Sequence, residues 1–227
     1  MNILCVAAHP DDELFGCGAT LRKLKNDGHS IYTCILCGDV NARHQRPDTD
    51  SLKRVSMNAE RIIGIDDSVK HGFDNIRFNT VPHLDMVQTI EKSIVQFKPS
   101  WVFAHHPSDL NIDHRVCYEA TMAAVRLPQR LSHDMPATMI RRVFLFEVPS
   151  ATDWAAPTER AFQPNCFFDA GATIDAKIQA LEAFQGALKP FPHSRSIENV
   201  RHLAHLRGAQ AGTTVAEAFC LVRDVNL

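Results

Sequence analysis

The sequence has no apolar stretch that approaches the roughly 20 residues needed by a membrane-spanning helix. Its N-terminus also lacks the basic region and long apolar core of a secretory signal peptide. Lys and Arg are spread along the chain and the formal net charge is −2, so no basic patch suggests nucleic acid or an anionic membrane. We therefore expect a cytoplasmic protein whose partner is a small molecule.

Cysteine occurs in a pattern that disfavours a disulfide framework. The count of seven is odd, and several of these residues fall inside apolar strand or helix patterns. The chain has 227 residues, of which 45% are hydrophobic and 22% are charged, so a single domain over residues 1–227 can bury a substantial core. The sequence leaves the formation of a homo-oligomer open.

Strand-like and helix-like patterns alternate along the chain. We expect strands at residues 3–7, 31–37, 101–104, 140–148 and 215–222, and helices at residues 11–26, 51–63, 84–98, 174–188 and 196–206. This order predicts an α/β fold with a Rossmann-like, mostly parallel sheet and helices on both faces. Gly16-Cys17-Gly18 lacks a third glycine and lies inside the first helix, so we expect no dinucleotide site.

The most informative segment follows the first strand directly. Ala8-His9-Pro10-Asp11-Asp12-Glu13 delivers a histidine and three carboxylates at the end of that strand. His9 and Asp12 can bind one divalent ion from this strand-to-helix turn, and Asp11 between them can act on a metal-bound water.

A second strand also ends in histidines and carboxylates. Residues 102–104 lead into His105-His106 and then to Asp113-His114. A third ligand from this segment completes a set of two histidines and one carboxylate with an open position for water, as in catalytic zinc sites. We choose His114 as that ligand with Asp113 as its support. One of His105 and His106 is expected to point inward.

Each of these residues has an ordinary structural alternative. His9 can be a hydrogen-bonded histidine, Asp11 and Asp12 can be first-turn acids favoured by the helix dipole, and Asp113 can cap the following helix. However, parallel strands place their carboxyl ends on one edge of the sheet, where open α/β sheets bind ligands. The convergence of two such clusters on that edge favours a metal site.

Together these segments resemble the LmbE-like, or PIG-L, family of zinc-dependent N-deacetylases, which have an AHPDDE segment near the N-terminus and a later Asp-His pair. Less specific similarity covers residues 72–75, 190–196, 207–208 and 216–219. The resemblance implies His9, Asp12 and His114 as metal ligands and Asp11 as the general base. Some relatives have a histidine at the position of Asn111, so the group that stabilises the oxyanion is left open.

The resemblance also implies a reaction and a substrate class. A zinc-bound water would attack the N-acetyl group of an amino sugar or amino-sugar conjugate, with Zn²⁺ as cofactor and Fe²⁺ as another divalent candidate. Asp11 or His193 would protonate the leaving amine, and Asp113 would hold a ligand histidine in the correct tautomer. Candidate substrate contacts are Arg43, Asp74, Asn75, Asn111 and Arg195. We place specificity on the loops at residues 38–50, 73–79 and 190–195.

Three alternatives remain at this point. A metal-dependent amidase would use the same residues to remove a larger acyl group from an amino-sugar conjugate. A phosphohydrolase would use Asp11 or Asp12 as a nucleophile. A non-catalytic sugar-binding protein would retain the metal as structure, although Asp11 would then have no use. Pro149, Pro157 and Pro164 also mark a long irregular connection, which we expect to form part of a functional wall.

Overall fold

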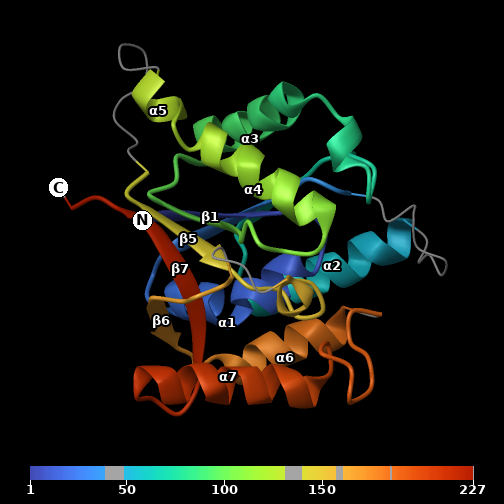
Figure 1. The fold of residues 1–227 in the computed structure, drawn as a ribbon, viewed down its shortest axis with the longest axis vertical. Helices are drawn as coiled ribbons and strands as arrows, with labels where there is room; N and C mark the ends of the chain where they lie inside the picture. The colour runs from blue at the N-terminus through green and yellow to red at the C-terminus, as the bar shows by residue number, and fades with distance from the viewer. Residues whose placement is uncertain (39–48, 131–139, 157–160, 185, 227) are drawn as a thin grey trace.

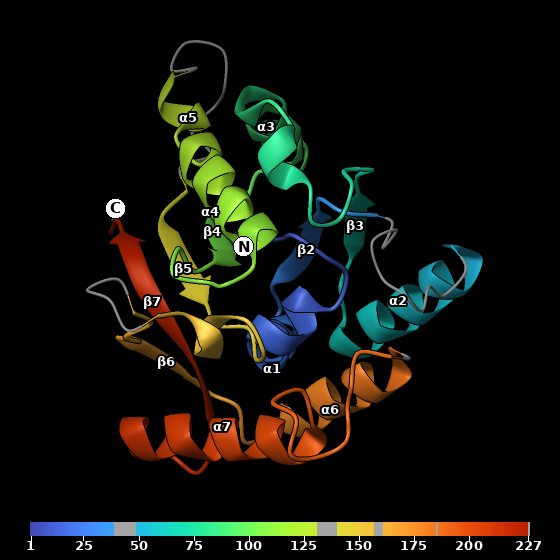
Figure 2. The same cartoon turned by 45° about the vertical axis from the view of Figure 1, so that its right-hand side comes forward.

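The computed structural model describes residues 1–38, 49–130, 140–156, 161–184 and 186–226. Across these residues, seven strands form one sheet in the order β3-β2-β1-β4-β5-β7-β6 (Figures 1 and 2). The strands are β1 (Asn2–Ala7), β2 (Ser30–Ile35), β3 (Asp67–Lys70), β4 (Trp101–His105), β5 (Arg142–Phe146), β6 (Cys166–Asp169) and β7 (Ala216–Asp224). The pairs from β3 to β5 are parallel, whereas β7 runs antiparallel to both β5 and β6.

Helices cover both faces of the sheet, as the sequence predicted (Figure 1). One face carries α1 (Asp12–Asn26), α2 (Thr49–Ile63), α6 (Ile174–Ala183) and α7 (Ile197–Ala211), and the other carries α3 (His83–Phe97) and α4 (Ile112–Ala124). Short elements are α5 (Leu127–Arg130), η1 (Phe78–Thr80) and η2 (Thr152–Trp154). Among the described helices, none combines the length and the apolar character that a membrane span requires.

Strand β1 shows why the core has two halves. Ile3 and Cys5 face the core cluster beneath α1, while Leu4 and Val6 face the cluster beneath α3 and α4. All four side chains are fully buried. Because successive side chains of a strand point to opposite faces, a strand buried on both sides is apolar throughout. The continuous apolar run at the start of the sequence is therefore the central strand of the sheet.

The two edge strands, β3 and β6, were not predicted from the sequence. β3 is polar and half exposed, and β6 is only four residues long. Neither has the alternation or the length from which a buried strand is predicted. The strand expected at residues 31–37 also ends earlier, because β2 stops at Ile35 and Cys37 makes an isolated bridge to Gly72.

A buried ion pair stabilises a kink in α1. Cys17 has non-helical backbone angles, which frees backbone groups on either side of the kink. Lys177 donates to the Phe15 carbonyl at 2.6 Å, and Glu217 accepts from the Thr20 amide at 2.7 Å. Lys177 and Glu217 lie 2.6 Å apart. The pair therefore satisfies backbone groups on both sides of the kink and ties this part of α1 to α6 and β7.

The topology brings the two metal-motif segments together. β1 and β4 are parallel neighbours, with Leu4 opposite Val102. Because the two strands are parallel, the chain leaves both at the same edge of the sheet, entering α1 after β1 and α4 after β4. Segments about one hundred residues apart in the sequence thus become adjacent at the edge where α/β sheets bind ligands.

Candidate metal centre and active site

The turn between β1 and α1 places His9 and Asp12 beside each other. Asp11 occupies the left-handed region with a φ of 99°, which aspartate tolerates better than most side chains. The backbone amide of His9 donates to Asp12 Oδ2 at 2.9 Å. This hydrogen bond closes the turn and fixes the Asp12 carboxylate next to the His9 ring.

The segment after β4 presents Asp113 and His114 from the first turn of α4. Asn111 is the N-cap residue, since its side chain accepts a hydrogen bond from the Asp113 amide at 2.9 Å. The cap fixes where the helix begins. It thereby sets the direction from which His114 approaches the β1–α1 turn.

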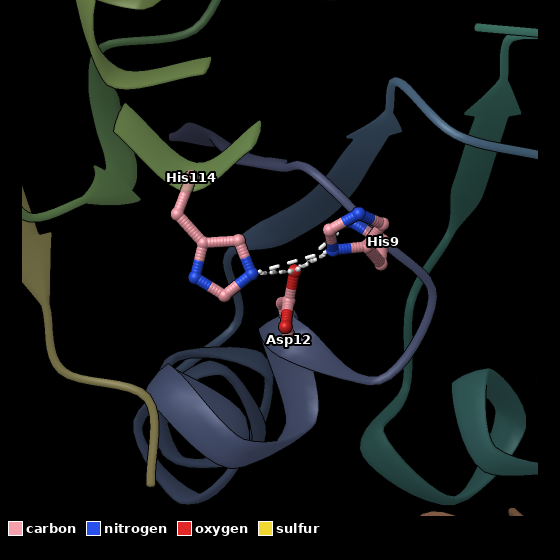
Figure 3. Close-up of side chains that lie close together, drawn as sticks. All are labelled: His9, Asp12 and His114. Atoms are coloured by element: carbon pink, nitrogen blue, oxygen red, sulfur yellow. Dashed lines mark hydrogen bonds and ion pairs between the residues drawn. The ribbon is translucent and has the colours of Figure 1, made fainter. Parts of the chain in front are cut away.

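His9, Asp12 and His114 point toward one another (Figure 3). Asp12 Oδ2 lies 3.3 Å from His9 Nδ1 and 3.2 Å from His114 Nε2, and the two nitrogens are 3.3 Å apart. All three side chains are buried. Ligand atoms that surround a tetrahedral zinc ion at about 2.0–2.1 Å lie about 3.3 Å from one another. The three residues therefore have the spacing that a metal site needs.

Two further observations fit a bound cation. Asp12 Oδ1 is buried and has no hydrogen-bond partner within the part of the chain that the structure describes. A buried carboxylate oxygen in that state is costly unless a cation lies close to it. The three residues also open onto a cavity of about 200 Å³, which we call the metal cleft. Its walls are formed by His9, Asp11, Asp12, Asn75, Ile76, Asn111, His114 and Arg195.

A buried carboxylate lies behind each of the two candidate ligand histidines. His9 Nε2 lies 2.9 Å from Asp113 Oδ2, and His114 Nδ1 lies 3.0 Å from Asp109 Oδ2. Thr152 in turn donates its hydroxyl to Asp109 at 2.9 Å. Such carboxylates fix the tautomer and orientation of metal-binding histidines. The nitrogens that remain for a metal are the two that face Asp12.

The charges at this centre depend strongly on one another. Burial lowers the pKa of His114, but Asp12 and Asp109 outweigh burial and raise that pKa to about 10. Burial raises the pKa of Asp12, but His114, His105 and His9 outweigh it and hold that pKa well below its usual value. Metal binding requires a neutral imidazole and an ionised carboxylate. A divalent ion would therefore displace a proton from this centre.

His105 lies directly beside the ligand set. Its ring stacks on that of His114 with centroids 4.1 Å apart, and its Nε2 accepts from the Ala8 amide at 2.9 Å. Burial and the neighbouring His114 lower the pKa of His105 to about 4. His105, Asp109 and His114 also lie close enough to form a second ligand set. However, His114 Nδ1 already forms an ion pair with Asp109 at 3.0 Å, and His105 Nε2 already accepts the hydrogen of the Ala8 amide.

Asp11 forms the wall of the metal cleft next to the ligands. Its side chain is buried, and its Oδ2 lies 3.4 Å from Arg195 Nη1. Arg195 is itself held in place, because its Nε donates to Ser150 Oγ at 2.9 Å and its guanidinium lies over the Phe15 ring. The loop that carries Arg195 therefore closes the cleft beside Asp11.

Comparison with known proteins agrees with this geometry. The sequence model of the PIG-L family, described as GlcNAc-PI de-N-acetylase, matches residues 4–125. The chain belongs to the PIG-L family. A curated relative, the uncharacterized deacetylase YaiS of Escherichia coli K12, is 31% identical over 148 residues, which are 61% of this chain and 76% of the relative.

Solved structures extend the likeness of this PIG-L chain over its whole length. The conserved protein TT1542 of Thermus thermophilus has a TM-score of 0.78 at 23% identity, with 99% of this chain and 96% of that chain covered. The N,N'-diacetylchitobiose deacetylase of Pyrococcus horikoshii has a TM-score of 0.77 at 16% identity, with 98% and 84% covered.

One structural neighbour catalyses a different class of reaction. GalB, the 4-carboxy-2-hydroxymuconate hydratase of Pseudomonas putida, has a TM-score of 0.78 at 18% identity, with 100% of this chain and 98% of that chain covered. At such identities the likeness shows a shared fold only. The reaction of the present PIG-L chain must therefore be argued from its site.

The structure gathers most of the predicted PIG-L site residues in one place. The three ligand candidates, Asp11 and the substrate candidates Asn75, Asn111 and Arg195 all line the metal cleft. Asp113 lies behind His9, whereas the carboxylate behind His114 is Asp109. The functional roles of these residues remain predictions.

Other predicted residues lie elsewhere. His193 is exposed and is not among the walls of the metal cleft, and its Nδ1 accepts from the Arg195 amide at 3.0 Å. Asp74 is exposed as well. His106 is buried against Ser108, with its Nδ1 2.8 Å from the hydroxyl oxygen. Arg43 falls outside the described residues, as does most of the loop at residues 38–50.

Sequence reasoning missed Asp109, Ser150 and Thr152. Asp109 is a third carboxylate in the segment after β4, and its position beside Asp113 and His114 was the available signal. Ser150 and Thr152 belong to the irregular connection that begins at Pro149, for which the sequence indicates a functional wall but no particular residue. Ser150 contacts Arg195 and Thr152 contacts Asp109, so these two residues are where the connection meets the candidate site.

Proposed function

We propose that this PIG-L protein is a metal-dependent hydrolase that removes the N-acetyl group from an amino sugar or an amino-sugar conjugate. The observation that carries the proposal is the buried His9, Asp12 and His114 set, with ligand atoms 3.2–3.3 Å apart, opening onto a cleft that Asp11 also lines. Metal sites that keep an open position are typical of catalysis. Membership of a family of deacetylases supports the amide as the bond that is cleaved.

The identity of the metal belongs to the proposal too. Two imidazoles and one carboxylate suit Zn²⁺ and also suit Fe²⁺. We favour Zn²⁺ because hydrolysis needs no redox chemistry. A bound ion would lower the pKa of a water molecule and polarise the amide carbonyl.

In the reaction, Asp11 acts as the general base. Its carboxylate takes a proton from the attacking water as the oxygen of that water bonds to the acetyl carbon. When the carbon–nitrogen bond breaks, the same proton passes from Asp11 to the leaving nitrogen, and the products are a free amine and acetate. Arg195 pairs with Asp11 and holds the carboxylate at the cleft wall.

Asn111 is our candidate for stabilising the oxyanion. Its Oδ1 is used to cap α4, so its amide group is oriented with Nδ2 as the remaining donor. The residue lines the metal cleft. A donor aimed at the carbonyl oxygen stabilises the charge that develops there during attack.

Acetate release tests the proposal. The protein is stripped of metal with a chelator, divided, and assayed with and without added Zn²⁺ on N-acetylglucosamine, its glycosides and a nucleotide-linked N-acetyl sugar. We expect acetate from at least one of these compounds and only in the presence of metal. Release that is independent of metal contradicts the proposal. Cleavage of longer N-acyl groups in preference to acetyl would favour the amidase alternative.

A further inference from the structure

A second cavity, which we call the outer chamber, adjoins the metal cleft. It has a volume of about 460 Å³ and shares Ile76, Asn111 and Arg195 with the metal cleft. Its other walls are formed by Leu110, Ile112, Ser150 and Ala151. A ligand whose reacting amide lies at His9 and His114 can therefore extend past Arg195 into the outer chamber.

The two cavities differ in chemistry. The metal cleft is lined by polar side chains except for Ile76, whereas the outer chamber has four apolar residues in its wall: Ile76, Leu110, Ile112 and Ala151. Ile76 and Leu110 are 51% and 56% exposed, so the outer chamber has two large apolar side chains in its wall that are open to solvent. Exposed apolar surface with a polar border often marks a ligand-binding groove.

A third exposed apolar side chain lies on a loop whose backbone is bonded to the wall of the outer chamber. Trp154 is 70% exposed and belongs to η2, where its amide donates to the Ala151 carbonyl at 3.3 Å. The Leu110 amide donates to the same carbonyl at 3.2 Å. The loops that carry Leu110 and Trp154 are therefore joined through Ala151, and both present large apolar side chains to solvent.

Ile76 is held in an unfavourable conformation at the junction of the cavities. Its φ of 60° is rare for a β-branched residue. Its amide donates to Asp113, the carboxylate that supports His9. The metal centre thus fixes the backbone that carries this apolar side chain, as expected for a residue kept at a binding site despite local strain.

We infer that the outer chamber binds an apolar aglycone of the amino sugar, such as an aryl or alkyl group. This inference rests on the proposed function. The sugar hydroxyls match the polar metal cleft, and the group beyond the sugar meets Ile76 and Leu110. A long acyl chain fits less well, because its carbonyl must lie at the metal ligands and its apolar tail would then desolvate the polar cleft.

The inference predicts a preference for the apolar member of a substrate pair. Methyl and phenyl glycosides of N-acetyl-β-D-glucosamine are compared by acetate release with metal, and by calorimetric binding to the metal-free protein. We expect the phenyl glycoside to be favoured roughly tenfold in kcat/KM and in Kd, because burial of the ring in the outer chamber removes apolar area from water. A methyl glycoside of N-octanoylglucosamine tests the acyl alternative.

Substitutions in the wall of the outer chamber test whether the preference for the phenyl glycoside arises there. Ile76→Asn removes apolar surface and is compatible with the left-handed backbone at this position. Leu110→Asn removes apolar surface from a second loop of the outer chamber. Each should reduce the preference to about threefold or less. Leu84→Asn is the matched control, because Leu84 is a 61% exposed leucine on α3 that lines neither cavity. It should keep the full preference.

The outcomes separate this inference from the proposed function. Acetate release without a preference overturns the inference and leaves the deacetylase proposal intact. A binding preference without acetate release overturns the proposed function and keeps the apolar subsite. Equal binding of the two glycosides, binding of neither, a preference that survives Ile76→Asn and Leu110→Asn, or a stronger gain from the octanoyl compound each overturns the inference.

Discussion

The two walls of the active-site region are built in opposite ways. On the metal side, His9 and His114 are 4% and 1% exposed, and each is held by a buried carboxylate. On the outer side, Ile76 and Leu110 are about half exposed and lie on loops. In the proposed reaction, the buried edge of the sheet therefore carries the chemistry, and the exposed loops contact the rest of the substrate. Changes on the metal side should therefore be the more severe.

Removal of a metal ligand should have the largest effect. We expect His114→Ala to lose bound metal and acetate release together, because two ligands cannot hold a catalytic ion tightly. Metal analysis by mass spectrometry and the acetate assay check this. His202→Ala, at an exposed histidine on α7, is the matched control and should keep both. If His114→Ala binds metal like the parent, the ligand assignment is wrong.

Replacement of Asn111 separates catalysis from helix capping. Asn111→Asp keeps a good N-cap but removes the side-chain donor, so kcat should fall by about a hundredfold to a thousandfold with metal retained. Asn111→Ala should lose the donor and also about 1 kcal/mol of stability from the cap. Kinetics and thermal unfolding of both variants provide the measurements. Unchanged kcat in Asn111→Asp would exclude Asn111 from the oxyanion site.

The supporting carboxylates should have a smaller effect than the ligands. Asp113→Asn weakens the hold on His9 Nε2 and should reduce metal affinity by about 10- to 100-fold. Asp109→Asn should act in the same way through His114. Titration with a metal-sensitive dye measures both. Parent-like affinity in the two variants would show that the histidines need no support.

The pH dependence should differ between the metal-free and metal-loaded protein. The pKa of His114 is raised from 6.5 to about 10 by Asp12 and Asp109 against the effect of burial. In the metal-free protein, the stability from this protonated histidine is present below about pH 6.5 and is lost as pH rises toward 10. Metal affinity should instead rise over the same range, by up to about tenfold per pH unit for one displaced proton.

Unfolding curves and metal titrations between about pH 6 and about pH 9 would test these opposite trends. Affinity that falls as pH rises within this range would contradict the role of His114 as a ligand.

The sequence predicted the central part of the fold better than its edges. β1 and β4 have six and five residues, are apolar except at Asn2 and His105, and are followed by turn residues, which is the pattern of a buried strand. β3 and β6 are short edge strands whose pairing depends on their neighbours. Their existence could not be predicted because tertiary contacts, not local pattern, determine them.

The candidate site also has a part that the local sequence predicts and a part that depends on tertiary contacts. His9, Asp11 and Asp12 lie on one tight turn, so their proximity follows from the sequence. Asp109 could not be paired with His114 in advance, because that contact depends on how the loop after β4 folds. The outer chamber was not predicted, since Ile76, Leu110 and Ala151 come from three separate loops and form no motif.

Acetate release by metal-loaded Asp11→Asn, with metal content measured in the same sample, tests whether Asp11 is the general base. Asparagine tolerates the left-handed backbone at this position and cannot accept the proton of the attacking water. We predict a metal content equal to that of the parent and a loss of activity of roughly a hundredfold or more. Parent-like acetate release by the metal-loaded variant would contradict the assignment of Asp11 as the general base.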